Sequence, residues 1–182
     1  MYLKPQDVVL LLKLIATKTP EWTFARLGKT LAMSTSHAFE SAMRVQQARL
    51  LSISKAPPSP RKARGVLFVP NRSNLKEFLI HGVKYSFPVE RGGITRGVPT
   101  AEGAAPLREY FSGSSALPPV WPYAQGDVRG TAFSPLYDNV PEAADRDPKL
   151  HELLALVDAI RDGRAREREI AIRELSARID SQ

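Results

Sequence analysis

Hydrophobic residues recur at helical spacing along the first 51 residues of the chain. Residues 5–17 have Pro5 in their first turn and carry an apolar stripe made by Val8, Leu11, Leu12 and Ile15. Two further helices are expected over residues 24–32 and 35–51, each directly after a Ser or Thr that is suited to cap it. Three helices joined by short turns are enough to form a compact unit.

The pattern changes after residue 51. Residues 65–69 are predicted to form a strand, residues 71–82 a short helix, and residues 83–88 a second strand because their apolar positions alternate. Residues 88–148 contain nine prolines and only short apolar runs. This composition predicts an irregular layer with a few short strands, wrapped over a helical core.

Residues 147–180 are predicted to be helical again. Asp147 is a good N-cap, Pro148 suits the first turn, and Asp162-Gly163 marks a break or kink. The apolar stripe of this segment comprises Leu150, Leu153, Leu154, Val157 and Ile160. The expected fold class is therefore α+β, with N-terminal helices, an irregular proline-rich mixed region and C-terminal helices.

Residues 23–51 contain the spacing of a helix-turn-helix. Leu27, Leu31 and Met33 fit the inward face of a first helix, and the small Gly28 lies where that helix would pass closest to its partner. Ser34 would cap the second helix, whose inward stripe consists of Ala38, Ala42 and Val45. A helix pair of this shape can place its second helix in the major groove of DNA.

The outward face of the second helix supplies candidate DNA contacts. We expect base edges to be met by Thr35, Ser36, His37, Phe39 and Glu40, next to the cap Ser34. Phe39 suits a thymine methyl group, although the wing or a partner could bury it instead. Phosphates would be met by Lys29, Arg44, Lys55, Arg61, Lys62 and Arg64, with a bidentate guanine contact as the alternative for Arg44.

Residues 52–64 hold three prolines and four cations, and two interpretations of them remain open. They follow the second helix where a winged helix has its hairpin, and the cations are the right type for phosphate contacts. A solvated proline-rich linker explains the same composition.

The charge distribution supports the nucleic-acid interpretation. Residues 1–70 carry 11 Lys and Arg against three Asp and Glu, a balance of +8, whereas residues 71–182 carry 15 against 16. A basic half beside a neutral half is typical of a DNA-binding domain joined to another domain. A solvated basic face is the simpler alternative.

Local signs of catalytic or metal chemistry are absent from the sequence. There is no cysteine, which suits a reducing cytoplasm, and the three histidines lie in separate elements without a second ligand at i+3 or i+4. The acidic residues of 138–147 are more typical of a solvated loop leading into a helix cap than of a cation site. We expect no enzyme activity, no cofactor, no metal and no membrane span, and a cytoplasmic location.

The residues from Trp22 to Phe24, Leu27, and Ser34 to Leu51 make residues 1–70 resemble bacterial winged-helix regulators of the MarR-like type. The resemblance implies that Ser34–Arg44 enter the major groove and that Lys55–Arg64 form the wing. A winged helix followed by a compact mixed domain also resembles antitoxins of the AbiEi kind, which repress their own operon and accompany a nucleotidyltransferase toxin.

Two functional expectations follow. The first is a sequence-specific transcriptional regulator, an autorepressor that binds double-stranded DNA as a homodimer through residues 1–70. Residues 71–182 would then serve partner binding, dimerisation or effector binding. The helices of 147–180 would be core, a dimer interface or a surface that binds another protein. The alternative is an antitoxin or adaptor whose C-terminal domain binds a partner protein such as a toxin.

Overall fold

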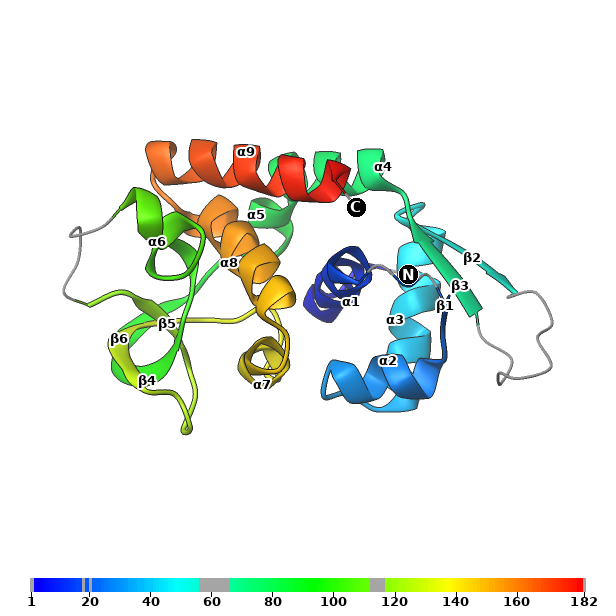
Figure 1. Cartoon of the computed structure of the whole chain (residues 1–182), viewed down its shortest axis with the longest axis horizontal. Helices are drawn as coiled ribbons and strands as arrows, with labels where there is room; N and C mark the ends of the chain where they lie inside the picture. The colour runs from blue at the N-terminus through cyan, green and yellow to red at the C-terminus, as the bar shows by residue number, and fades with distance from the viewer. Residues whose placement is uncertain (1, 18, 20, 56–65, 112–116, 182) are drawn as a thin grey trace.

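The structure is a computed structural model that describes residues 2–17, 19, 21–55, 66–111 and 117–181. The fold is a mixed α+β arrangement, which confirms the expected α+β class, while the winged helix-turn-helix stays a prediction. Helices surround a central helix, and two small groups of strands lie at opposite ends of the molecule (Figure 1).

The first 70 residues form three helices and a three-stranded sheet. In chain order these elements are α1 (Pro5–Ala16), β1 (Glu21–Trp22), α2 (Phe24–Thr30), α3 (Thr35–Gln47), β2 (Leu51–Lys55) and β3 (Val66–Pro70). The sheet has the order β1-β3-β2 and both pairings are antiparallel, with Ile53 opposite Phe68. The three expected helices and the strand at residues 65–69 are therefore present, and the third helix ends four residues earlier than expected.

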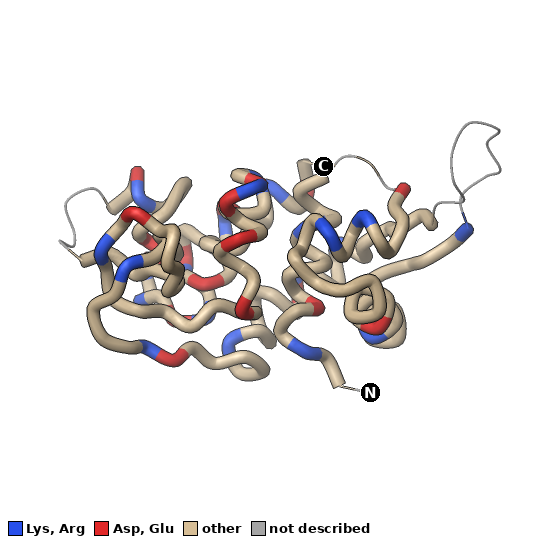
Figure 2. The backbone as a smooth tube through the Cα atoms, turned by 90° about the horizontal axis from the view of Figure 1, so that it is seen from below, with Lys and Arg blue, Asp and Glu red and all other residues tan. Residues whose placement is uncertain are grey.

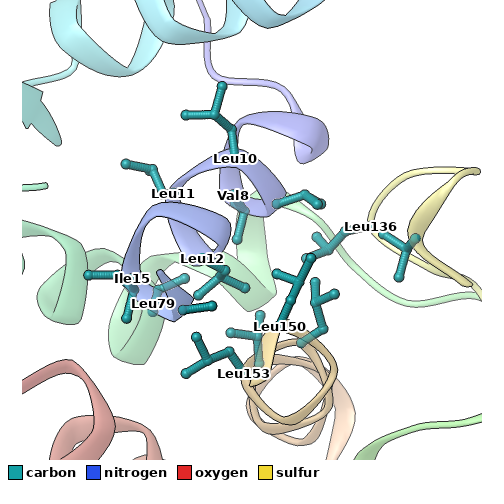
Figure 3. Close-up of a cluster of buried hydrophobic side chains, with 14 of the residues drawn as sticks. Val8, Leu10, Leu11, Leu12, Ile15, Leu79, Leu136, Leu150 and Leu153 are labelled. Carbon is teal, nitrogen blue, oxygen red and sulfur yellow. The ribbon is translucent and has the colours of Figure 1, made fainter. Parts of the chain in front are cut away.

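Helix α1 is buried on all sides. Every residue from Asp7 to Ala16 is buried, because the helix packs against α3 on one side and α8 on the other (Figure 1). Figure 3 shows Leu12 and Ile15 beside Leu79, and Leu150 and Leu153 of α8 near the same cluster. The expected apolar stripe of Val8, Leu11, Leu12 and Ile15 is confirmed. The other sides of the helix are buried as well, beyond its first turn.

The strand expected over residues 83–88 is wrong. The chain stays helical from α4 (Arg72–Glu77) through a π-helical turn (Phe78–Gly82) into α5 (Val83–Ser86). Leu75, Leu79 and Val83 are fully buried, whereas Tyr85 is 77% exposed. The spacing of Leu75, Leu79 and Val83, four residues apart, therefore keeps this segment helical despite the alternating apolar positions of residues 83–88.

The described part of residues 88–148 contains three strands that all pair with one another. The strands are β4 (Arg91–Pro99), β5 (Pro119–Pro122) and β6 (Val128–Phe133), accompanied by short helical turns at α6 (Leu107–Tyr110) and α7 (Val140–Asp145). The three strands close on themselves, and this closure requires glycine at two positions. A Cβ on Gly97 would lie 1.9 Å from the backbone oxygen of Trp121, and a Cβ on Gly130 would lie 2.0 Å from the backbone oxygen of Pro118. The expected short strands are confirmed. Their closed pairing was not predicted from the sequence.

The C-terminal helices are α8 (Pro148–Asp162) and α9 (Ala165–Asp180), and the break falls at the expected Asp162-Gly163. Helix α8 is buried from Leu153 to Arg161, and α9 lies across it with Ala171, Leu175 and Ile179 inward (Figure 1). The apolar stripe of α8 thus belongs to the core of one chain. A single hydrophobic cluster runs from Val8 to Ile179, and a domain boundary at residue 70 stays a prediction.

Candidate nucleic-acid interface

Helices α2 and α3 meet at a tight turn. Gly28 faces that turn so closely that a Cβ would lie 2.8 Å from the oxygen of Met33, and Ala32 takes a left-handed backbone with φ of 51°. The Ser34 hydroxyl accepts a hydrogen bond of 3.1 Å from the amide of His37, as a helix N-cap does. Leu27, Leu31, Met33 and the stripe of α3 are buried, as the spacing predicts.

Five of the predicted base-contacting residues lie together on α3. Its first two turns leave exposed Thr35, Ser36, His37, Phe39 and Glu40, next to the exposed cap Ser34. These side chains offer hydroxyl, imidazole and carboxylate groups around one aromatic ring. The structure brings together the polar set that the sequence assigned to one face.

Phe39 is held in place while remaining accessible. Its ring lies edge-on to Phe24 with centroids 5.2 Å apart, and Phe24 in turn lies 5.5 Å from Phe68 of β3. Phe39 still exposes 47% of its surface. The aromatic ring is therefore a fixed apolar element on an otherwise polar face.

Arg44 does not lie on that face, which corrects the expectation from the sequence. It is only 5% exposed, and its Nη2 and Nε donate hydrogen bonds of 2.7 and 2.8 Å to the two carboxylate oxygens of Asp7. The hydrogen bonds from Arg44 to Asp7 raise the pKa of Arg44 above its usual value, and Asp7 also accepts from Ser41 at 2.6 Å. Arg44 connects α3 to α1 and is not available for phosphate or guanine.

Apart from Arg44, the predicted phosphate contacts are two cations that the structure describes and three that it does not. Lys29 is exposed on α2, and Lys55 is exposed at the end of β2, where Figure 2 shows a cation beside the grey trace. Arg61, Lys62 and Arg64 lie outside the described residues, and so does most of the segment interpreted as a wing or a linker.

Three further exposed polar residues on or beside α2 and α3 were not identified from the sequence. Arg26 is exposed on α2, with its guanidinium 4.7 Å from the ring centroid of Trp22, and Gln47 and Arg49 are exposed at the end of α3. Helical spacing could have found Gln47, since it lies on the same side of α3 as Ser36 and Glu40. The exposure of Arg26 and Arg49 could not be found in this way, because it depends on how the neighbouring elements pack.

The acidic segment 138–147 supplies two of the polar contacts that connect the helix-turn-helix half with the rest of the chain. The side-chain amide of Asn139 donates to the carbonyl oxygen of Ala32, inside the turn between α2 and α3. Lys13 of α1 donates to Asp147 over 2.6 Å, and Asp147 also caps α8 through the amides of Lys149 and Leu150. The expected cap is confirmed, and the acidic segment 138–147 contributes to contacts between elements.

The polar side chains His151 and Asp158, outside the helix-turn-helix, are hydrogen-bonded to other parts of the fold. Among the described residues, no group of three or more His, Asp or Glu is arranged to hold a metal ion. The Nε2 of His151 lies 2.7 Å from the carbonyl oxygen of Pro99. Asp158, only 1% exposed, accepts hydrogen bonds from Thr100, Trp121 and Arg161.

Glu102 is the exception, because its buried Oε2 has no hydrogen-bond partner among the described residues. Burial raises the pKa of Glu102, and the nearby Glu167 adds to the rise. Between the unfolded-state pKa and the raised folded-state pKa, the folded protein binds the proton more tightly. The free energy of unfolding therefore falls as pH rises through that window. At neutral pH the ionised Glu102 still lowers the stability of the folded protein.

We expect Glu102→Gln to raise the Tm at pH 7, and the gain to disappear below the unfolded-state pKa of about 4.5. Thermal unfolding at both pH values measures this difference. The matched control is Glu169→Gln on the exposed face of α9, which should show no such pH-dependent gain. A Tm shift of the same size at both pH values would contradict the assigned cause.

No helix among the described residues is long and apolar enough to cross a membrane. Comparison of the chain with protein-family models, with curated proteins and with solved structures finds no match in any of the three.

Proposed function

We propose that residues 1–70 are a winged helix-turn-helix and that the protein is a sequence-specific, DNA-binding transcriptional regulator. The observation that carries the proposal is the exposed N-terminal face of α3, which follows a tight turn and a serine cap. In a helix-turn-helix, the N-terminal residues of the second helix contact base edges. The element order from α1 to β3 and the antiparallel sheet β1-β3-β2, whose strand β2 follows α3, support this assignment.

Charge supports the same proposal. Residues 1–70 have a balance of +8. The exposed cations Arg26 and Lys29 lie on α2, Arg49 lies in the turn after α3, and Lys55 lies on β2. These side chains would contact phosphates and position the protein without reading sequence. The absence of cysteine fits a protein of the reducing cytoplasm.

The direct test is binding of the full chain to its own upstream DNA and to random duplex of equal length, across a salt series. We expect a strong preference for the upstream DNA and a steep loss of affinity with salt. Sedimentation of the complex would show whether a homodimer binds, as expected for an autorepressor with two half-sites. Absence of binding to either duplex at low salt would overturn the proposal.

Replacing Lys29 and Lys55 together by Gln should weaken binding to both duplexes. If each cation meets one phosphate, the slope of log K against log salt should become about 2 units less steep. The matched control removes two cations at the other end of the molecule, Arg96 and Arg129, which are exposed and lie opposite each other in the β4–β6 register. An unchanged slope in the Lys29 and Lys55 variant would remove both residues from the interface.

A protein partner is the second candidate function. The observation that favours it is the exposure of large apolar side chains in residues 71–182, including Tyr85 at 77% and Ile94 at 54%. Exposed apolar surface is typical of protein interaction sites when it is contiguous. An antitoxin or adaptor of this kind would form a stable complex with a second chain encoded beside it, which size-exclusion chromatography of the co-expressed pair would detect.

A further inference from the structure

Phe39 and Glu40 are consecutive residues on the second turn of α3, and both are accessible. Phe39 exposes 47% of its surface, and the Glu40 side chain exposes 58%. Both belong to the part of α3 that is proposed to enter the major groove. They offer two different chemistries, an apolar ring and a carboxylate that only accepts hydrogen bonds when ionised.

Phe39 contacts an aromatic ring that packs against the core, and Glu40 lies near a buried arginine. The Phe39 ring rests against Phe24, which is itself supported by Phe68. One carboxylate oxygen of Glu40 lies 3.9 Å from Nη1 of Arg44, whose other nitrogens are bound to Asp7. At 3.9 Å this contact is an ion pair and not a hydrogen bond, so the oxygens of Glu40 are able to accept other hydrogen bonds.

The burial of Arg44 changes which bases α3 can recognise. The exposed positions of α3 carry no Lys or Arg, since they are Thr35, Ser36, His37, Phe39, Glu40, Gln46 and Gln47. Bidentate Arg and Lys contacts to guanine are the commonest specific contacts in the major groove. That mode is not available to α3, whose second turn instead offers the apolar ring of Phe39 and the carboxylate of Glu40.

We propose that Phe39 and Glu40 read pyrimidines on neighbouring base pairs, with Phe39 against the 5-methyl group of a thymine and Glu40 accepting from the N4 amino group of a cytosine. Cytosine presents the only pyrimidine donor in the major groove, and thymine presents the only methyl group. This inference rests on the proposed DNA-binding function and specifies its target chemistry.

The test is selection of bound duplexes from a random library, with the wild-type protein and with Glu40→Gln. Wild type should enrich a site with a fixed cytosine, and Glu40→Gln should change that position to adenine, because Gln pairs with the N6 and N7 atoms of adenine. One such contact should be worth roughly 5- to 150-fold in discrimination. The control is Glu77→Gln, which removes the same charge from exposed Glu77 on α4 and should keep the cytosine.

Phe39 is tested on the selected site by replacing thymine with deoxyuridine, which removes only the methyl group. Wild type should lose about fourfold in affinity at one thymine, the amount expected for one buried methyl group. Phe39→Ala should bind both duplexes equally. An identical loss in wild type and Phe39→Ala would overturn the assignment of Phe39.

The outcomes separate the inference from the proposed function. If no sequence is enriched and no duplex is bound, the DNA-binding function itself is wrong and the inference fails with it. If a site is enriched but Glu40→Gln keeps the cytosine and binds all duplexes more tightly, Glu40 only repels phosphates. The pyrimidine assignment is then overturned, while the DNA-binding function stands.

Discussion

Asp7→Ala is expected to lower the free energy of unfolding by about 3–5 kcal/mol, the range for removing one partner of a buried ion pair. Asp7 is fully buried and accepts hydrogen bonds from Ser41, from Arg44 and from the amide of Lys4. Its loss would leave the Arg44 guanidinium, only 5% exposed, without a counter-charge. Chemical denaturation followed by circular dichroism measures the change.

Two variants establish the cause of that loss. Asp7→Ala combined with Arg44→Met should recover part of the stability, because no unpaired charge then stays buried. Asp180→Ala should cost no more than about 1 kcal/mol, since its contact with Lys76 is solvent-exposed. Equal losses for Asp7→Ala and Asp180→Ala would contradict the view that burial makes the first pair important.

The Asp7 network also affects how a DNA experiment on Arg44 is interpreted. Because Arg44 attaches α3 to α1, Arg44→Ala should reduce DNA binding through loss of the fold, without any direct contact to DNA. A loss of binding in a protein that remains fully folded at the assay temperature would instead indicate a direct contact. The stability measurement therefore has to accompany every binding measurement on this residue.

Asp158→Ala is expected to cost a similar amount, about 3–5 kcal/mol. Asp158 accepts from Thr100 at 2.8 Å, from Trp121 at 2.7 Å and from Arg161 at 2.7 Å, and all four side chains are buried. Arg161 in turn donates to the carbonyl oxygens of Phe87, Pro88 and Ser134. The Asp158–Arg161 ion pair attaches the closed strands and their flanking loops to α8. Its loss should therefore loosen residues 87–134.

The control for Asp158 lies one turn further along the same helix. Asp162 accepts from Arg91 at 2.6 Å, but both side chains are more than a third exposed. Asp162→Ala should therefore cost no more than about 1 kcal/mol. Hydrogen exchange of residues 87–134 should accelerate in Asp158→Ala and remain unchanged in Asp162→Ala, and the reverse order would refute the assigned role.

The residues that could be assigned from sequence alone are those governed by local rules. The cap Ser34, the inward stripe of Ala38, Ala42 and Val45, and the cap Asp147 all follow from helix periodicity and the chemistry of helix ends. The exposure of Phe39 and Glu40 follows from the same periodicity. These features depend on neighbours within a few positions in the chain, so no knowledge of the fold is needed.

Arg44 could not be assigned in this way. It lies at the border between the inward and outward sides of α3, where periodicity does not decide between burial and exposure. Asp7, 37 positions earlier, decides it by offering a buried carboxylate on α1. An arginine at such a border is drawn into the core when its counter-charge is already there.

The helical spacing and the cap and turn residues of this chain determined by themselves its three N-terminal helices, the turn between α2 and α3 and the two C-terminal helices. Only the tertiary structure decided the burial of Arg44, the burial of α8 within one chain, and the closure of β4, β5 and β6. Those outcomes depend on contacts such as Asp7 with Arg44, Asp158 with Trp121, and Gly97 with the backbone of Trp121. Such contacts join residues that are distant in sequence, and their free energy is gained only when the whole core is assembled.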